Sequence, residues 1–281
     1  MAWENAGMRA WLAAAWVVAG VVNASAQKVE TGFLNRSLQV DGVEYRYQVY
    51  VPREFQGSTS WPVILALHGA GESGSDGLIQ TNVGLGTAIR RHAERFPAIV
   101  VFPQIRADGT PGWQGAGARA ALAATDNAIK EFNGDKSRVS LTGLSAGGNG
   151  SWYLASRFPE RFAAVAVVCG WITEFHGATG ISYPALAPAD TDPFAAIARR
   201  VSRLPIWIFH GDADTTVPVE ESRRMATALK AIGANVQYTE LPGVGHNAWD
   251  PAYDRADLLT WMLRQRALLA PTDAPPVRPG Q

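Results

Sequence analysis

A serine flanked by glycines is the strongest chemical signal in this sequence. Ser145 lies in the pentapeptide Gly-Leu-Ser-Ala-Gly, between a strand-like stretch at 138–142 and a helix-compatible stretch at 149–158. A Gly-x-Ser-x-Gly sequence in that setting forms a sharp, strained turn that exposes the serine hydroxyl as a nucleophile. Side chains at Gly143 and Gly147 would collide with neighbouring backbone, so both positions require glycine. The alternative interpretation is a glycine-rich turn whose serine only caps the next helix.

Two backbone N–H groups are candidates for stabilising a negatively charged oxygen beside this serine. Acyl transfer develops such an oxygen, which needs preorganised donors. One donor comes from the residue after the nucleophile and the other from the loop after an early strand. These positions are Ala146 and Ala70, the latter in Leu-His-Gly-Ala-Gly-Glu at 67–72. His68 in that loop is interpreted as structural; its alternative role as the base is disfavoured because it precedes Ser145.

Two polar loops near the C-terminus hold the candidate acid and base. Asp214 follows an apolar stretch at 206–209, and His246 follows a strand-like stretch at 236–241. Because the carboxyl ends of parallel strands meet at one edge of a sheet, both side chains are expected beside Ser145. His246 would take the serine proton and return one to the leaving group. Asp214 would hold the imidazole tautomer and stabilise its cation.

Other titratable residues compete for these roles. Asp212 is the alternative acid, and Asp250 is too close in sequence to His246 to be preferred. His176 is interpreted as exposed or facing the substrate, and Cys169, the only cysteine, as a small core residue. No His/Cys/Asp cluster has metal-ligand spacing, and no glycine loop of a phosphate- or dinucleotide-binding type is present. No cofactor or metal is therefore expected.

Apolar runs and helical patterns alternate along the chain. Residues 38–52 alternate apolar and polar side chains, which predicts an antiparallel strand or hairpin. Continuous apolar runs predict buried strands at 63–67, 98–102, 163–168 and 206–209. Helical spacing predicts helices over 118–132, 219–232 and 254–269. The alternation predicts an α/β fold: a mainly parallel, doubly wound sheet with helices on both faces.

One stretch, residues 171–204, does not fit this alternation. Its aromatic, Gly, Pro and Asp residues, with a short helical pattern at 194–201, predict a small cap or lid-like excursion. The alternative is a long surface loop without substrate contact. Trp113 and Trp171 are candidate substrate contacts that would stack on an aromatic or sugar-linked acyl group. They are equally well interpreted as packing aromatics.

The first 26 residues have the order of a secretory signal. The apolar run at 10–22 follows a short segment with one arginine, and Ala-Ser-Ala at 24–26 is a cleavage site. The run is shorter than the roughly 20 residues that span a bilayer, which disfavours an uncleaved membrane anchor. We expect a secreted or periplasmic protein with one domain at 27–270 and a disordered Pro-rich tail at 271–281.

The charge balance limits the classes of partner. The 281 residues include 25 Lys and Arg and 25 Asp and Glu, so the formal net charge is zero. Nothing in this balance indicates a nucleic-acid footprint or a polybasic membrane patch. We therefore expect no nucleic-acid partner and no stable membrane insertion after signal removal.

With these motifs, the chain resembles the secreted esterase and "predicted peptidase" group of α/β hydrolases. This group is related to feruloyl esterases, polyhydroxybutyrate depolymerases and prolyl-oligopeptidase-like hydrolases. The resemblance covers residues 38–268 and rests on four motifs: LHGAGESGSD, GLSAGGNGSWYLASRFPERFAAVAVVCG, IWIFHGDADTTVP and LPGVGHNAWDPAY. It implies the α/β-hydrolase fold, places the acid of an HGxxDxxVP pattern on Asp214 rather than Asp212, and places the base on His246.

The resemblance implies a function without a cofactor. We expect hydrolysis of carboxylic esters, small or polymer-linked, through an acyl-enzyme. The alternatives are a serine peptidase of the prolyl-oligopeptidase-like type and a non-catalytic binding protein on a hydrolase scaffold. Acyl transfer to an acceptor other than water also stays open.

Overall fold

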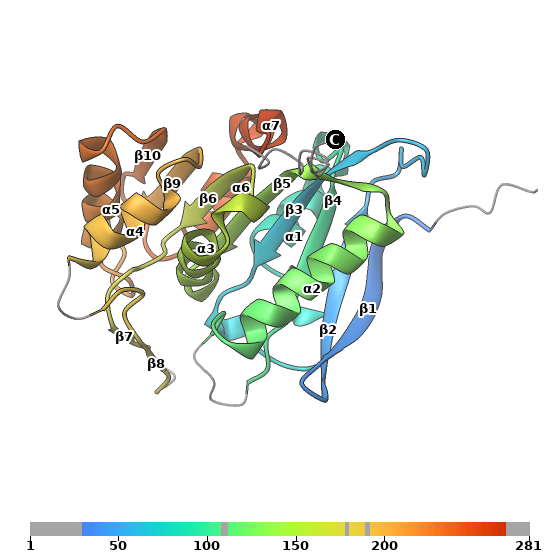
Figure 1. Cartoon of the computed structure of the whole chain (residues 1–281), viewed down its shortest axis with the longest axis horizontal. Coiled ribbons are helices and arrows are strands. Elements are labelled where there is room, and N and C mark those ends of the chain that lie inside the picture. The colour runs from blue at the N-terminus through green and yellow to red at the C-terminus, as the bar shows by residue number, and fades with distance from the viewer. Residues whose placement is uncertain (1–29, 108–111, 178–179, 189–191, 268–281) are drawn as a thin grey trace, which may run out of the picture.

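A sheet of eight strands forms the centre of the structure, a computed structural model that describes residues 30–107, 112–177, 180–188 and 192–267 (Figure 1). The strands are β1 (Gly32–Val40), β2 (Val43–Val51), β3 (Trp61–Leu67), β4 (Ile99–Pro103), β5 (Gly134–Leu144), β6 (Ala164–Val168), β9 (Ile206–Gly211) and β10 (Val236–Leu241). Their spatial order is β1-β2-β4-β3-β5-β6-β9-β10. β2 pairs antiparallel with both β1 and β4, and the other neighbours pair parallel.

Helices cover both faces of this sheet. The helices are α1 (Leu85–Arg91), α2 (Ala116–Glu131), α3 (Ala146–Arg157), α4 (Pro193–Val201), α5 (Glu220–Ala231), α6 (Trp249–Tyr253) and α7 (Ala256–Arg264). Side chains of α2, α3, α4 and α5 belong to the core on one face, and those of α1, α6 and α7 to the core on the other. The predicted fold class, a mainly parallel doubly wound sheet with helices on both faces, is confirmed.

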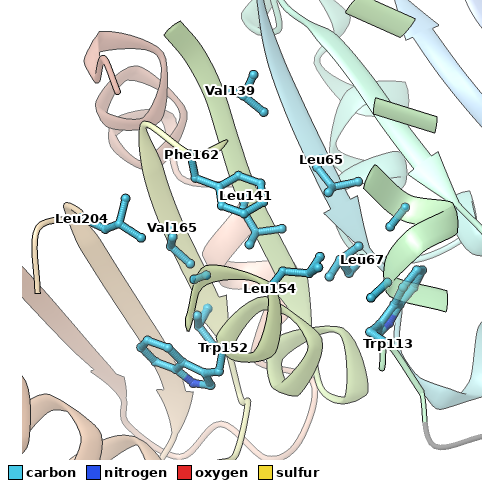
Figure 2. Packing of buried hydrophobic residues seen from close by; sticks show 14 of the residues in the cluster. Leu65, Leu67, Trp113, Val139, Leu141, Trp152, Leu154, Phe162, Val165 and Leu204 are labelled. Carbon is cyan, nitrogen blue, oxygen red and sulfur yellow. The ribbon is translucent and has the colours of Figure 1, made fainter. Parts of the chain in front are cut away.

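The core on the α2–α5 side explains why the central strands are continuous apolar runs. Leu65 of β3, Leu141 of β5 and Val165 of β6 are fully buried and point toward Trp152 and Leu154 of α3 (Figure 2). Because helices cover both faces of a parallel sheet, neither face of its strands is exposed to solvent, and polar side chains are disfavoured there. Truncating one of these leucines to alanine would cost about 2–5 kcal/mol of the free energy of unfolding.

The helix predicted over 254–269 is wrong in its bounds. Within that range the structure has α7 alone, at Ala256–Arg264, and the separate helix α6 ends at Tyr253 just before it. Arg255 has extended backbone, and its guanidinium pairs with Asp257 in the first turn of α7. The break lets Tyr253 bury its ring and place its hydroxyl 2.9 Å from Thr142 Oγ1. The apolar spacing indicated the helix but not where it starts and ends, so the predicted range begins two residues before α7 and continues beyond its end at Arg264.

The expected cap at 171–204 is smaller than predicted. Its second half forms α4, whose side chains Phe194, Ile197 and Val201 are buried in the core with α3 and α5. Asp192 caps this helix by accepting hydrogen bonds from two backbone N–H groups of its first turn. Only the stretch before α4 lies outside the layers, and it contains the two-residue strands β7 (Phe175–His176) and β8 (Ser182–Tyr183).

The expected signal at 1–26 and the expected tail at 271–281 lie outside the described residues. Within the parts of the chain that the structure describes, no helix is both long and apolar enough to cross a membrane.

Candidate active site

Ser145 lies on a strained turn between β5 and α3. Its backbone has φ 53° and ψ −118°, a left-handed conformation that is costly for any residue but glycine. A Cβ on Gly143 would lie 2.1 Å from the Gly147 carbonyl oxygen, and a Cβ on Gly147 would lie 2.1 Å from the Leu67 carbonyl oxygen. The prediction that side chains at these two glycines would collide with backbone is confirmed. The turn is possible only because residues 143 and 147 have no side chains.

The structure brings Ser145, Asp214 and His246 together. His246 Nε2 lies 2.9 Å from Ser145 Oγ, and His246 Nδ1 lies 2.8 Å from Asp214 Oδ2. Because Nδ1 faces a carboxylate, it carries the proton and donates, which leaves Nε2 to accept the serine O–H. The edge of Trp249 packs against the imidazole at 5.4 Å between centroids. These contacts place a hydroxyl, an imidazole and a carboxylate in one hydrogen-bonded chain.

Asp214 is held by four donors and its side chain is buried. Oδ1 accepts from the backbone N–H groups of Thr216 and Val217, at 2.8 and 2.9 Å. Oδ2 accepts from His246 and, at 3.2 Å, lies beside His210 Nε2. Burial opposes the charge of Asp214, but the hydrogen bonds from His210, His246 and the backbone outweigh it and hold the pKa far below its usual range. Asp214 therefore stays ionised at neutral pH.

The competing residues have other partners. Asp212 accepts a hydrogen bond from the Gly243 N–H at 2.7 Å and so shapes the loop that carries His246. Asp250 bonds to a neighbouring asparagine amide. His176 is exposed, and its Nδ1 lies 2.8 Å from the hydroxyl of a serine on β8. No hydrogen bond joins Asp212, Asp250 or His176 to Ser145 or His246 in the described part of the chain.

His68 is buried and supports the loop beside the serine. Its Nε2 accepts the Ile105 N–H at 3.1 Å, so its Nδ1 carries the proton and donates to the Gly69 carbonyl at 2.6 Å. Burial lowers the pKa of His68 to about 4, which keeps the ring neutral. The structural interpretation of His68 agrees with these contacts.

Trp113 is not a substrate contact, and that prediction is wrong. Its ring is buried in the core near Leu67 (Figure 2), and its Nε1 donates to the His68 carbonyl at 2.9 Å. The ring also packs edge-on against the His68 imidazole. Trp113 therefore supports the loop after β3 from the core. Its apolar ring is buried, and its single donor, Nε1–H, is satisfied by a carbonyl of that loop.

A cavity of about 270 Å³ opens at Ser145 and His246. Three rings line its far side, and we call Trp171, Phe175 and Tyr183 the aromatic wall. The Trp171 ring lies 4.4 Å from Phe175 and 5.1 Å from Tyr183, measured between centroids. The predicted contact Trp171 thus lines the cavity, whereas Phe175 and Tyr183 were missed. Nothing in the spacing of these two residues signals a shared surface.

Glu72 is the one acidic residue in the cavity lining, and sequence analysis assigned it no role. Its Oε2 and the Ser145 Cβ lie 3.1 and 3.5 Å from the position that a Cβ on Gly69 would take. Burial raises the pKa of Glu72, partly offset by hydrogen bonds from backbone N–H groups. No lysine or arginine of the described residues lines this cavity.

The predicted N–H donors lie at the starts of two helices. Ala146 is the first residue of α3, and Ala70 is the first residue of the single 3₁₀ turn Ala70–Glu72. The first N–H groups of a helix have no acceptor within it, so both are open to another partner. Gly69 and Ala70 line the cavity, and Ala146 packs against the aromatic wall.

Cys169, Asp214 and His246 are the group of potential metal ligands in the described residues, with ligand atoms within 4.8 Å of one another. Two of the three already hydrogen-bond to each other. Cys169 is fully buried, burial raises the pKa of its thiol, and its Sγ donates to the His246 carbonyl at 3.6 Å. A protonated thiol is a poor metal ligand, so this chemistry suits a neutral core residue better than a metal site.

Comparison with known proteins agrees with this architecture. The sequence profile of the prolyl oligopeptidase family matches residues 106–265. An "Uncharacterized secreted protein" of Arthroderma benhamiae is 28% identical over 206 residues, which are 67% of this chain and 22% of that protein. Acetylxylan esterase A of Emericella nidulans is 24% identical over 257 residues, 72% of this chain and 80% of that one. A crystal structure of a thermostable esterase superimposes with TM-score 0.69 and 29% identity, covering 83% of this chain and 63% of that one.

The chain thus spans only about a fifth of the fungal secreted protein that it matches. The family profile, by contrast, covers more than half of this chain, from the loop before α2 to the end of α7. That span holds the turn of Ser145 and the loops of Asp214 and His246. By its profile match and its sheet topology, this chain belongs to the prolyl oligopeptidase family and has the α/β-hydrolase fold.

Proposed function

We propose that this protein is a serine hydrolase that cleaves carboxylic esters through an acyl-enzyme intermediate. The observation that carries the proposal is the hydrogen-bonded chain from Ser145 through His246 to Asp214, which opens into a cavity. Nucleophile and base lie within hydrogen-bond distance, and a third group orients the base. The similarity to esterases supports the ester over other acyl substrates.

The first half of the reaction forms the acyl-enzyme. Ser145 Oγ attacks the ester carbonyl carbon as His246 Nε2 takes the hydroxyl proton. The carbonyl oxygen becomes an oxyanion, for which the N–H groups of Ala70 and Ala146 are the proposed donors. The N-terminus of α3 adds a favourable field for that charge. The tetrahedral intermediate then collapses, the C–O bond to the alcohol breaks, and His246 returns the proton to the leaving alcohol.

The second half releases the acid. A water molecule replaces the alcohol, gives its proton to His246 Nε2, and attacks the acyl carbon. Collapse of the second tetrahedral intermediate breaks the bond to Ser145 Oγ, which regains the proton from His246. The buried charge of Asp214 stabilises the imidazolium in both halves without taking the proton itself.

The cavity indicates a compact, uncharged acyl group with aromatic character. Its volume lies just below the range of about 300–1,000 Å³ that is usual for drug-sized ligands. The aromatic wall favours planar groups. The carboxyl of Glu72 disfavours an anionic substrate in this space, because no lysine or arginine of the described residues lines the cavity.

We also propose that the protein is exported. The order of residues in the first 26 positions and the similarity to a secreted fungal protein support this proposal. Its partner is then a small or polymer-linked ester outside the cytoplasm.

Hydrolysis of p-nitrophenyl acetate, butyrate and octanoate and of a feruloyl ester tests the enzyme proposal. We expect turnover by residues 27–281, and a loss of at least about a thousandfold in kcat for Ser145→Ala with an unchanged circular dichroism spectrum. Ser156→Ala is the matched control, because Ser156 is a buried serine of α3 that bonds only to the Tyr153 carbonyl.

Three outcomes would contradict the proposal. Faster turnover of short peptidyl anilides than of aryl esters would replace the esterase with a peptidase. Equal activity of wild type and Ser145→Ala would remove Ser145 as the nucleophile. Failure of a fluorophosphonate probe to label the protein would favour a non-catalytic binding protein.

A further inference from the structure

Behind Asp214 lies a second histidine that the reaction scheme leaves without a role. His210 is the penultimate residue of β9, and its side chain is fully buried. Its Nδ1 lies 2.7 Å from the hydroxyl of Ser222, which is also buried, in the first turn of α5. Its Nε2 lies 3.0 Å from the Val217 carbonyl oxygen and 3.2 Å from Asp214 Oδ2. Both ring nitrogens of His210 are therefore in contact with polar groups inside the protein.

These contacts determine where the ring proton of His210 lies. The two neighbours of Nε2, a carbonyl oxygen and an ionised carboxylate oxygen, can only accept, so Nε2 carries a proton and donates. A hydroxyl can donate or accept, so Ser222 can satisfy Nδ1 by donating to it. The neutral ring with its proton on Nε2 thus makes every hydrogen bond available at this place. A ring protonated only on Nδ1 would instead set a lone pair against the charge of Asp214.

His210 therefore mirrors His246 across one carboxylate oxygen. Asp214 Oδ2 lies 2.8 Å from His246 Nδ1 on the cavity side and 3.2 Å from His210 Nε2 on the core side, and it shares the Nε2–H of His210 with the Val217 carbonyl. Oδ1 is meanwhile held by the backbone of the same loop. With His210 in place, the carboxylate cannot rotate away from His246 without breaking a buried hydrogen bond, which is costly.

We propose that His210 and Ser222 are positioning residues that extend the catalytic chain to Ser222–His210–Asp214–His246–Ser145. The Val217 carbonyl and the Asp214 carboxylate set the tautomer of His210, the hydroxyl of Ser222 holds the ring at Nδ1, and His210 sets the orientation of Asp214. His210 also draws part of the carboxylate charge toward itself, so it weakens the hold of Asp214 on a protonated His246. The inference rests on the proposed catalytic roles of Ser145, Asp214 and His246.

Few other charged or titratable groups face His210. Glu240 lies opposite it in the register of β9 and β10, and that carboxylate is bound by Arg223 and Tyr238. The thiol of Cys169 lies near Asp214 at the end of the adjacent strand, and burial keeps it protonated. Because the Glu240 carboxylate is already bound by other side chains, we expect substitutions at His210 to affect mainly Asp214.

Two variants of His210 separate a hydrogen-bonding role from a space-filling one. His210→Leu fills the space without a donor, whereas His210→Gln places an amide N–H near the position of Nε2. For His210→Leu we expect kcat for an aryl ester to fall about tenfold, the loss of one hydrogen bond to a charged group, with little change in KM. The acidic limb of the kcat/KM–pH profile should move about one unit to higher pH, because the unshared carboxylate stabilises the imidazolium of His246. His210→Gln should restore most of both.

Ser222→Ala provides an independent variant with a smaller change. We expect the same direction of shift and a two- to fivefold loss of kcat, on the order of a neutral hydrogen bond. Ser140→Ala is its control, because Ser140 is equally buried and bonds only to the Met262 carbonyl, away from the cavity. This control should leave the pH profile unchanged even if its stability falls.

Nitrogen-15 spectra of the histidine rings give a readout that needs no substrate. The chain has five histidines, so single-residue replacements assign each ring. We expect His210 to carry its proton on Nε2 at neutral pH in the wild type and in Ser145→Ala. A proton on Nδ1 alone would overturn the inference, even if the His210 variants do not fold. An unchanged pH limb in His210→Leu, or equal behaviour of the Leu and Gln variants, would overturn it too. Retained activity in Ser145→Ala would instead count against the proposed function.

Discussion

The two sides of the cavity are built in different ways. On one side, which we call the catalytic edge, Ser145, Asp214 and His246 lie in turns at the ends of β5, β9 and β10, and each is bound to backbone or to another side chain by hydrogen bonds. On the other side, the aromatic wall rests on ring contacts and on two paired strands of two residues each. Hydrogen bonds are directional and hold the side chains at the strand ends in accurate positions. Contacts between rings are not directional, so a packed aromatic surface tolerates substitutions better. We therefore expect substitutions on the edge to abolish chemistry or folding, and substitutions on the wall to alter substrate preference.

The largest expected effect concerns the two aspartates of one loop. Asp214→Asn should lower kcat about ten-thousandfold, because an amide cannot accept the Nδ1–H of His246 in the same way and favours the wrong tautomer. Asp212→Asn is the matched control, since its oxygen keeps the Gly243 N–H as a partner. Steady-state kinetics of both variants on one aryl ester measure the difference. A comparable loss of kcat in Asp212→Asn would mean that disruption of the loop, and not loss of the Asp214 carboxylate, lowers the activity.

The next effect concerns the folding of the edge. Gly147→Ala should lower the free energy of unfolding by more than about 3 kcal/mol, because its new methyl meets the Leu67 carbonyl oxygen. Gly57→Ala should change it by less than about 0.5 kcal/mol, because nothing lies within 4 Å of a Cβ there. Urea unfolding of both variants tests this, and equal midpoints would show that the turn relaxes more easily than its geometry suggests.

His68 gives the edge a pH dependence that the wall lacks. Its folded pKa of about 4 lies below the usual value near 6.5, so the unfolded chain binds a proton first as the pH falls. The stabilisation from the neutral ring is complete above pH 6.5 and is lost as the pH drops toward 4. Between pH 7 and pH 5 this amounts to about 2 kcal/mol. His68→Gln should remove that part of the pH dependence in urea titrations; parallel slopes for wild type and variant would contradict the prediction.

The smallest effect is expected on the aromatic wall. Phe175→Ala should raise KM for an aryl-acyl ester about tenfold with little change in kcat for acetate esters, since it removes a stacking surface and no catalytic contact. Phe55→Ala is the matched control, because Phe55 is also half-buried and packs against aromatic rings, but away from the cavity. A change in kcat for every ester alike would show that the wall supports the catalytic edge and does not select the acyl group.

The sheet, most of its helices and the three residues of the hydrogen-bonded chain could be predicted from the amino-acid pattern alone. Ser145, Asp214 and His246 each follow a strand-like stretch, and parallel strands end at one edge whatever the rest of the chain does. The collision of side chains at Gly143 and Gly147 was likewise deducible from local sterics. These inferences depend on period, local backbone geometry and strand direction, which are short-range properties.

The surroundings of those residues depend on how the layers pack. The sequence does not show that Trp113 packs behind the loop while Trp171 meets Phe175 and Tyr183, because both tryptophans lie in irregular segments. Nor does it show that His210, whose position fits one more residue of a buried strand, lies 3.2 Å from Asp214. Such contacts join residues without a common period, so they exist only once the layers have packed.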